Sequence, residues 1–420
     1  MKGLRLSVLP VLFLAQFVTP NKVEQVHLSL SGKMDEMVVT WLTQGPLPNV
    51  TPYVTYGLSK DALRWTAKAK TTSWKDQGSH GYVRYTHRAV MTKMVPGDLY
   101  YYQVGSSQAM SDTFHFRQPD PEKPLRAAIF GDLSVYKGQP SINQLISATH
   151  DDHFDLIIHI GDLAYDLHDS EGNRGDDYMN AIQPFAAYVP YMVFAGNHET
   201  DGHFNHIKNR FTMPANGVND DNLFWSVDYG AVHFVALNSE YYAEAMSKEA
   251  EAQYKWLEAD LAAHRTARWT IVMFHRPWYC STSSAKGCQA YQDMLSRKGS
   301  TGFPGLEKLL YDNKVDIVLY GHKHTYERMW PIYDGTPYKS NDSGHIKNAK
   351  APVYMLTGGA GCHTHEGPSD STPQSFSVTR LGQYGYTRLK VYNSTHLSTY
   401  FVDTSDKVGN FMDRFYLEKD

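Results

Sequence analysis

The chain has 420 residues and a formal net charge of −4, with 42% hydrophobic and 20% charged residues. This composition is typical of a globular protein with a large core, and it excludes a disordered or fibrous chain. The length favours two or three domains. A nucleic-acid partner requires a basic face, which the acidic balance argues against. An anionic small substrate would therefore have to be attracted by local positive charge.

The N-terminal residues 1–20 begin with Lys2 and Arg5 and continue into an apolar run over residues 6–18. This layout is typical of a secretory signal peptide, and the run is too short to span a bilayer. No other stretch is apolar and long enough to cross a membrane. We therefore expect a secreted, extracellular protein with no membrane partner, and a lysosome-type compartment is the alternative. No pattern in the sequence indicates an oligomeric state.

Glycosylation and cysteine patterns agree with export. Cys280 and Cys288 are close enough in the chain to close one loop through a disulfide bond. Cys362 is left over, and we interpret it as a small buried hydrophobic residue. Three acceptor triplets for N-linked glycosylation are present, at Asn49, Asn341 and Asn393.

Residues 21–118 contain short alternating runs that are separated by turn residues. About seven such strands within roughly 100 residues are the pattern of an immunoglobulin-like sandwich. This region carries no cluster of metal-binding or nucleophilic residues. The expected strands are residues 26–30, 37–41, 53–56, 82–85, 89–91, 99–102 and 113–116.

A connector rich in proline and charge, residues 119–124, predicts the domain boundary. Beyond it, residues 125–420 alternate apolar strand-like runs with helical stretches. Helical spacing of apolar residues is clearest over residues 248–265 and 305–313. This alternation predicts a single α/β catalytic domain.

Five apolar runs of this second part end in polar residues of metal-ligand type. Buried strands that deliver polar groups as they leave a sheet build sites at its carboxyl edge. Each motif alone is weak, because Gly-Asp is most often a turn and a lone histidine is most often structural. Their combination in one domain predicts a site. The residues are Gly131 and Asp132, 161–165, 195–199, His275 and 321–324.

The residue types suit two different metal ions. Carboxylates and phenolate are hard anionic donors suited to a trivalent ion, whereas imidazole and an asparagine carbonyl suit a divalent one. His322 and His324 are two residues apart, so an extended segment points both to one side with roughly 6.5 to 7 Å between Cα atoms. Each could then serve one of two metals that lie ~3.5 to 4 Å apart.

Together these motifs resemble the five ordered blocks of the purple acid phosphatases, in the calcineurin-like metallophosphoesterase superfamily. Residues 21–118 resemble the fibronectin-type domain of the long, plant-like members, and residues 358–361 and 384–386 resemble their C-terminal blocks. The resemblance covers nearly the whole mature chain. It implies a fibronectin-III-like β-sandwich followed by a four-layer α/β/β/α metallophosphoesterase domain.

The resemblance also implies a dinuclear centre of Fe(III) and one divalent metal, which would be Zn, Fe or Mn. Asp162 would bridge the two ions. Tyr165 distinguishes this family from related metallophosphoesterases, because its phenolate on ferric iron produces the purple colour. Asp132, Tyr165 and His324 would bind Fe(III), and Asn197, His275 and His322 would bind the divalent metal.

The implied function is an acid phosphatase that hydrolyses phosphate monoesters. A hydroxide activated at the two metals would attack phosphorus in line, without a phosphoenzyme. His198 would contact the phosphate and stabilise charge or donate a proton. The alternatives are a phosphodiesterase or nucleotide pyrophosphatase on the same core, and an extracellular binding protein with a relic metal site. The filled ligand positions disfavour the relic.

Two departures from the family pattern concern loops. Ser134 closes the first block where a glycine is frequent. Family members commonly place a histidine after the fourth block for the leaving group, but no histidine lies between His275 and His322. Tyr291 is a weak substitute, so the sequence leaves the general acid open. Six further histidines have no companion ligands nearby in the sequence and are interpreted as structural: His27, His87, His115, His150, His153 and His233. His203 and His206 could line the entrance of the site, and the roles of His363 and His365 stay open.

Overall fold

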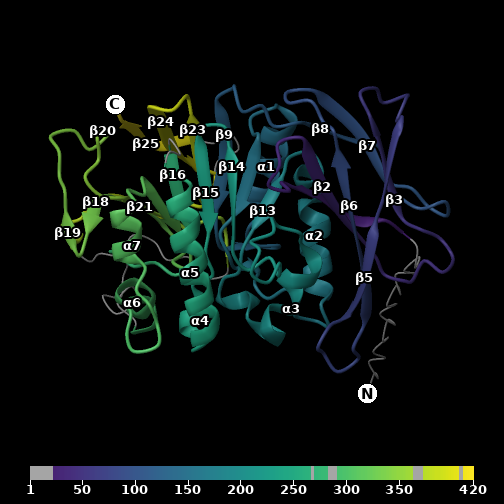
Figure 1. Ribbon diagram of the computed structural model, residues 1–420, viewed down its shortest axis with the longest axis horizontal. Helices are drawn as coiled ribbons and strands as arrows, with labels where there is room; N and C mark the ends of the chain where they lie inside the picture. The colour runs from purple at the N-terminus through teal and green to yellow at the C-terminus, as the bar shows by residue number, and fades with distance from the viewer. Residues whose placement is uncertain (1–21, 266–268, 282–290, 363–371, 406–409) are drawn as a thin grey trace, which may run out of the picture.

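A computed structural model describes residues 22–265, 269–281, 291–362, 372–405 and 410–420. The expected fold is confirmed: a β-sandwich formed by the N-terminal strands is followed by two mixed sheets with helices (Figure 1). The proposed signal peptide of residues 1–20 lies outside the described residues. Among the helices that the structure describes, none has the length and apolar character needed to cross a membrane.

Two antiparallel four-stranded sheets form the sandwich, with strand orders β1-β2-β6-β5 and β4-β3-β7-β8. Their facing side chains include Trp41, Tyr102 and Phe116, which are buried. The first sheet contains β1 (Glu24–Ser29), β2 (Glu36–Thr43), β5 (Lys70–Lys75) and β6 (Val83–Thr92), and the second contains β3 (Tyr53–Gly57), β4 (Trp65–Lys68), β7 (Leu99–Gly105) and β8 (Phe114–Arg117).

Two details of the sandwich differ from the sequence prediction. The expected strands at residues 82–85 and 89–91 form one strand, β6, which pairs with β2 over eight residues. Strands β4 and β5 were not predicted, because most of their side chains are exposed and show no apolar alternation. Both are held by pairing with longer strands, β4 with β3 and β5 with β6.

Most of the remaining strands form two mixed sheets. One has the order β13-β11-β9-β23-β24-β25-β20, and the other has the order β14-β15-β16-β17-β21-β18-β19, with β22 paired to β18. The first contains β9 (Leu125–Phe130), β11 (Leu156–His159), β13 (Tyr191–Val193), β20 (His345–Lys347), β23 (Gly385–Val391), β24 (His396–Asp403) and β25 (Asn410–Glu418). The second contains β14 (Trp225–Tyr229), β15 (Val232–Ala236), β16 (Trp269–Met273), β17 (Ile317–Tyr320), β18 (Tyr326–Tyr333), β19 (Thr336–Pro337), β21 (Val353–Thr357) and β22 (Ser377–Leu381).

Each mixed sheet contains a group of neighbouring parallel strands that are almost entirely buried. In one sheet β9, β11 and β13 run parallel, and in the other β15, β16, β17 and β21 do. Continuous apolar strands of this kind are buried on both faces. Because parallel strands end at the same edge, polar residues that follow them are brought together.

Helices cover the sheets and connect their strands. In Figure 1, α5 and α7 lie in front of the second sheet, and α2 lies between the mixed sheets and the sandwich. The helix expected over residues 248–265 is α5, and the one expected over residues 305–313 is α7. The helices are α1 (Gln139–His150), α2 (Asn173–Ala186), α3 (Asp201–Arg210), α4 (Glu240–Ala243), α5 (Ser247–Ala263), α6 (Tyr291–Lys298) and α7 (Glu307–Asp312).

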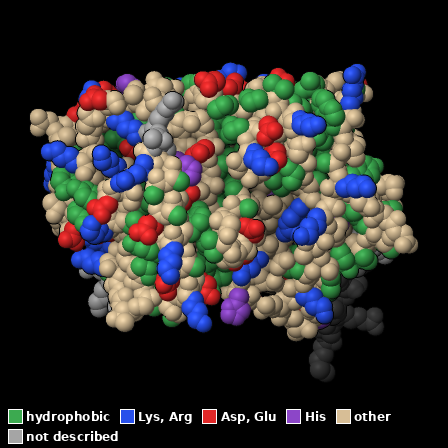
Figure 2. All heavy atoms as spheres, in the orientation of Figure 1, with side chains coloured by type: hydrophobic (Ala, Val, Ile, Leu, Met, Phe, Trp, Pro, Cys, Tyr) green, Lys and Arg blue, Asp and Glu red, His purple; other side chains and the backbone are tan. Residues whose placement is uncertain are grey.

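On the face shown in Figure 2, Lys and Arg side chains are interspersed with Asp and Glu side chains. Neither sign of charge forms a continuous stripe there. A nucleic-acid interface needs a basic patch or stripe. The described side chains on this face form no such basic stripe.

A buried ion cluster attaches the sandwich to the mixed sheets. Asp176 of α2 accepts hydrogen bonds from Arg84 of β6, at 2.7 Å, and from Arg210 of α3, at 2.7 Å. Burial would raise the pKa of Asp176, but the charges and hydrogen bonds of Arg210 and Arg84 hold it below its usual range. Gln25 of β1 completes the cluster through Asp176 and Arg210.

We predict that Asp176→Asn destabilises the protein by about 3 kcal/mol, because it leaves two guanidinium groups buried without a carboxylate. Urea unfolding followed by tryptophan fluorescence measures the loss. The exposed neighbour provides the control: Asp177→Asn should change the free energy of unfolding by less than about 0.5 kcal/mol. Equal stability of the Asp176 variant and the wild type would contradict the role of the cluster.

The same cluster predicts how stability depends on pH. Since the folded pKa of Asp176 lies below its unfolded value, its contribution is complete above about pH 4 and is lost as the pH falls further. The stability difference between wild type and Asp176→Asn should be constant from pH 7 to pH 5 and should narrow below pH 4. A difference that disappears between pH 7 and pH 5 would contradict this assignment.

Candidate metal centre

All seven expected ligand residues lie at the carboxyl ends of buried strands. Asp132 follows β9, Asp162 and Tyr165 follow β11, and Asn197 follows β13. From the other sheet, His275 follows β16, and both His322 and His324 follow β17. A short parallel pairing of β10 (Leu133–Ser134) with β12 (Leu163–Ala164) holds the first two loops side by side. Each sheet thus contributes part of one centre.

One group of donors consists of Asp132, Tyr165 and His324. The phenol of Tyr165 donates to Asp132 Oδ1 at 3.0 Å and lies 2.8 Å from His324 Nε2. The distance from His324 Nε2 to Asp132 Oδ1 is 3.4 Å. Three potential ligand atoms therefore converge on one point.

A second group consists of Asn197, His275 and His322. The side-chain oxygen of Asn197 lies 2.7 Å from His322 Nδ1 and 3.1 Å from His275 Nε2. Asp162 Oδ2 lies 3.1 Å from the same His275 nitrogen. Asp162, His275 and His322 also offer ligand atoms within 4.8 Å of one another. This arrangement has the spacing that a metal ion requires.

The backbone at four of these residues is in the left-handed region. The φ angles are 65° for Asp132, 56° for Asp162, 51° for Tyr165 and 71° for His322. Residues other than glycine rarely adopt positive φ, and such strain concentrates at functional sites. The surrounding structure must therefore hold these side chains against a local conformational preference.

Charge at the centre also suits cations. Burial acts to lower the pKa of His275, but the carboxylate of Asp162 raises it to about 10. Burial also acts to lower the pKa of His324, but the hydrogen bond with Asp132 raises it to about 11. The carboxylates thus hold protons on these two imidazoles, whereas burial and the neighbouring His275 keep the pKa of His322 well below its usual range. Metal ions replace such protons, because their ligands bind in the deprotonated form.

Glu199 fixes the loops that carry the ligands. Its buried carboxylate accepts hydrogen bonds at 2.8 Å from three backbone N–H groups, those of Asp162, Leu163 and Gly196. The glycine is required because a Cβ at position 196 would lie 2.3 Å from Asp162 Oδ1. The sequence pattern singled out the motif around Glu199 but not this role.

His198 lies beside the ligand groups and is oriented by a carboxylate. Its Nδ1 is 2.6 Å from Asp166 Oδ1, and its Nε2 is 3.9 Å from Asp162 Oδ2. Burial would lower the pKa of His198, but the hydrogen bond with Asp166 and nearby carboxylates raise it to about 9. Asp166 was not identified from the sequence, although it follows Tyr165 directly.

Cys362 does more than fill space. Its thiol lies 2.8 Å from His324 Nδ1, the ring nitrogen that faces away from Tyr165 and Asp132. Partners of this kind orient metal-binding histidines. The interpretation of Cys362 as a small buried hydrophobic residue is therefore incomplete: the side chain is buried, but it contacts a predicted ligand.

Several expected features lie elsewhere. The acceptor residues Asn49, Asn341 and Asn393 are exposed. Cys280 is buried, but Cys288 lies outside the described residues, so their pairing stays a prediction. The side chain of Tyr291 is also outside the described part of the chain.

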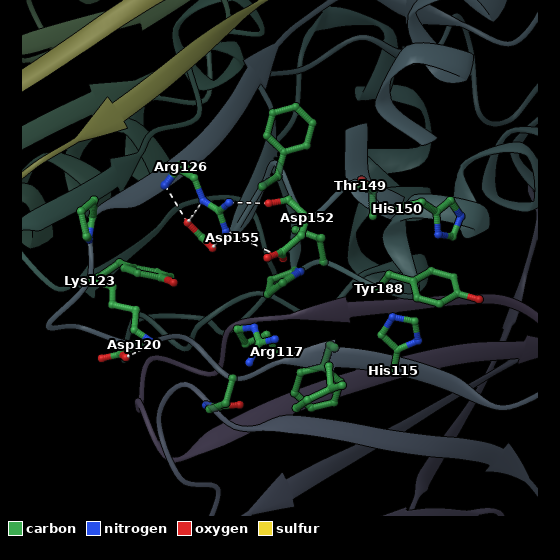
Figure 3. Close-up of a pocket in the computed structure, with 18 of the residues that line it drawn as sticks. His115, Arg117, Asp120, Lys123, Arg126, Thr149, His150, Asp152, Asp155 and Tyr188 are labelled. Carbon is green, nitrogen blue, oxygen red and sulfur yellow. Dashed lines mark hydrogen bonds and ion pairs between the residues drawn. The ribbon is translucent and has the colours of Figure 1, made fainter. Parts of the chain in front are cut away.

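A cavity of about 610 Å³ lies between the sandwich and the mixed sheets, lined in part by β8, α1 and β9 (Figure 3). Its lining includes none of the seven expected ligands. Arg126 pairs with Asp155 at 2.6 Å, and Lys123 pairs with Asp120 at 3.1 Å. These pairs neutralise two of the four Lys and Arg side chains that line the cavity; the other two are Arg117 and Lys390.

Three family models match most of the chain. The family model described as "Purple acid Phosphatase, N-terminal domain" matches residues 23–118, "Calcineurin-like phosphoesterase" matches residues 125–326, and "Iron/zinc purple acid phosphatase-like protein C" matches residues 351–414. The solved structure of purple acid phosphatase PPD1 from yellow lupin seeds has a TM-score of 0.80 and 24% identity, covering 96% of this chain and 75% of that one. This likeness shows the shared fold.

Curated relatives are more similar in sequence. "Acid phosphatase type 7" of Danio rerio is 36% identical over 411 residues, which cover 94% of this chain and 91% of that protein. "Purple acid phosphatase 18" of Arabidopsis thaliana is 31% identical over 392 residues, covering 89% and 79%. Similarity of this extent over most of both chains establishes common descent, and the chain belongs to the purple acid phosphatase family.

Proposed function

We propose that this acid phosphatase hydrolyses phosphate monoesters at two metal ions held by the two donor groups. The observation that carries the proposal is the division of six donors into two groups of three, with Asp162 beside the second. Two metal ions would supply a nucleophile at acidic pH and would stabilise charge on the phosphoryl oxygens. No protein nucleophile is required, so no phosphoenzyme should form.

The donor types support Fe(III) in the group of Asp132, Tyr165 and His324. Burial and the carboxylates of Asp132 and Asp162 raise the pKa of Tyr165, so its ionisation requires a strong Lewis acid. Neutral Asn197, His275 and His322 suit a divalent ion, Zn, Fe or Mn. Two carboxylates and one phenolate would contribute a charge of −3, and a ferric and a divalent ion would contribute +5. The centre would then carry a net charge of about +2, which would attract a phosphate dianion.

His198 is the protein group best placed to act on the substrate. Its imidazole is held by Asp166 and packs against Tyr165, with ring centroids 4.6 Å apart. Its pKa of about 9 keeps it protonated at acidic pH. We propose that it donates a hydrogen bond or a proton to the phosphoryl group.

We also propose the domain division and location expected from the sequence. Residues 1–20 would be removed as a signal peptide, 21–118 would form the sandwich domain, 119–124 the linker and 125–420 the catalytic domain. Exposure of Asn49, Asn341 and Asn393 supports glycosylation during export. The printed names of the Danio rerio and Arabidopsis thaliana relatives described above favour the phosphatase over the diesterase and relic alternatives. A relative with 28% identity is named "Probable inactive purple acid phosphatase 27".

A substrate panel tests the reaction class. The purified, metal-loaded protein should hydrolyse small phosphate monoesters between pH 4 and pH 7, and it should hydrolyse diesters much more slowly. Preferential hydrolysis of diesters or of nucleotide pyrophosphates would favour the alternative on the same core. Two bound metals without turnover of any phosphate ester would support the relic.

Tyr165→Phe tests the ferric assignment. The wild type should show a broad visible band from phenolate-to-iron charge transfer, and the variant should lose it because the phenolate is absent. Tyr384→Phe is the control: Tyr384 donates to the carbonyl oxygen of Cys362 and belongs to neither donor group, so the band should persist. A colourless, active wild type without iron would contradict the ferric assignment.

Asp166→Asn tests how His198 is positioned. Loss of the carboxylate should lower the pKa of His198, so the alkaline limb of the pH–kcat profile should move to lower pH. Because pH 5 lies below the ordinary pKa of histidine, His198 should stay protonated there even in the variant. The kcat near pH 5 should therefore change less than the kcat near pH 7. Asp169→Asn, which removes a partner of Arg174 instead, should leave the profile unchanged. A uniform loss of kcat at all pH values would contradict the assignment.

A further inference from the structure

A second cluster of metal-ligand side chains lies near the N-terminal end of β15. It comprises Asp228 of β14, His233 of β15, and Asp260 and His264 at the C-terminal end of α5. His233 is the second residue of β15, whereas the predicted metal centre follows the carboxyl ends of the strands parallel to it. The cluster and the phosphatase centre are therefore at opposite edges of one sheet.

We propose that Asp228, His233 and His264 form a separate zinc site, which joins the β14–β15 hairpin to α5. Asp228, His233 and His264 offer ligand atoms that all lie within 4.8 Å of one another. The proposal does not depend on the phosphatase assignment.

Secondary structure brings the residues together in two pairs. Asp228 and His233 are directly opposite each other on antiparallel strands, and His233 Nδ1 lies 2.8 Å from Asp228 Oδ1. Asp260 and His264 are four residues apart, so they share one side of the helix end. The rings of His233 and His264 stack at 3.9 Å with an interplanar angle of 14°. The strand pair thus faces the helix pair.

Asp260 sets which nitrogen of each histidine faces the site. Its Oδ2 accepts from His233 Nε2 at 2.8 Å, and its backbone oxygen accepts from His264 Nδ1 at 2.8 Å. Ser226 fixes the carboxylate by donating to Asp260 Oδ1 at 2.7 Å. Metal-binding histidines almost always have such a partner on the second nitrogen. One residue therefore orients both imidazoles.

The remaining donors point at the same place. His233 Nδ1 and His264 Nε2 both face the carboxylate of Asp228, the latter at 3.6 Å from Oδ2. Ligands of a tetrahedral zinc ion, bound at roughly 2.0 to 2.2 Å, lie about 3.3 Å apart. Because each lone pair lies in the plane of its ring and the two rings are stacked, one imidazole must rotate out of the stack for both nitrogens to bind one ion. The Asp228 side chain is 59% exposed and His233 is 1% exposed, so an ion has access to one side of a partly buried site.

Two imidazoles and one carboxylate favour zinc over magnesium or calcium, which prefer oxygen ligands. Three protein ligands leave one position for water or for another ligand. Binding would replace a proton on His233, which otherwise donates to two carboxylates. The expected effect is a fixed contact between the hairpin and α5.

Metal analysis of the full-length protein in zinc-buffered solution tests the proposal. The wild type should bind one more zinc per chain than His264→Ala or Asp228→Asn, and zinc should raise the Tm of the wild type more than that of either variant. Asp260→Asn should weaken this extra site roughly 10- to 100-fold, because it removes the carboxylate that orients His233. His345→Ala removes a comparable surface histidine beside Glu418 and should retain the extra zinc.

Phosphatase activity and the visible band separate this site from the catalytic centre. Both should be unchanged in His264→Ala and Asp228→Asn, because neither residue contacts the seven expected ligands. Equal zinc content in the wild type and in folded His264→Ala would overturn the proposal. The histidines would then be protonated and paired with the aspartates, without a metal ion. If either variant lost phosphatase activity together with the extra zinc, the zinc site would not be separate from the catalytic centre, and the proposal would be overturned.

Discussion

A hydrogen bond from His275 Nδ1 to the carbonyl oxygen of Ile160, 3.0 Å long, joins the ends of two separate sheets. One sheet supplies Asp132, Asp162, Tyr165 and Asn197, and the other supplies the three expected histidine ligands. Neither sheet alone carries a complete donor group. The spacing of the donors is thus set by how the two sheets pack, since interiors are close-packed and resist small shifts.

This arrangement places a local strain on the loops. Four expected ligands have positive φ, which most side chains avoid. Glu199 counters that strain by accepting three backbone hydrogen bonds from the loops after β11 and β13. Asp176 acts at longer range, because it attaches the sandwich to α2 and α3. The phosphatase centre therefore depends on buried carboxylates with structural roles as well as on the ligands.

The motifs that contain the donors could be found in the sequence because they follow buried apolar strands, which is a local pattern; the ligand role of each residue came from the family resemblance. Contacts between distant residues could not be found in this way. Cys362 and His324 are 38 residues apart, and only the fold shows that they touch. His233 was interpreted as structural because its partner on α5, His264, lies far along the chain. Strands β4 and β5 escaped prediction because their largely exposed side chains carry no apolar period.

Two metal ions, one in each donor group and with iron beside Tyr165, would form the catalytic centre. Anomalous diffraction from crystals of the purified protein, recorded on both sides of the iron absorption edge, locates each ion and identifies iron. We predict one iron peak among Asp132, Tyr165 and His324. A second metal peak should lie among Asn197, His275 and His322, and it should show the iron signal only if the divalent metal is iron. A single metal shared by both groups, or no iron beside Tyr165, would contradict the account.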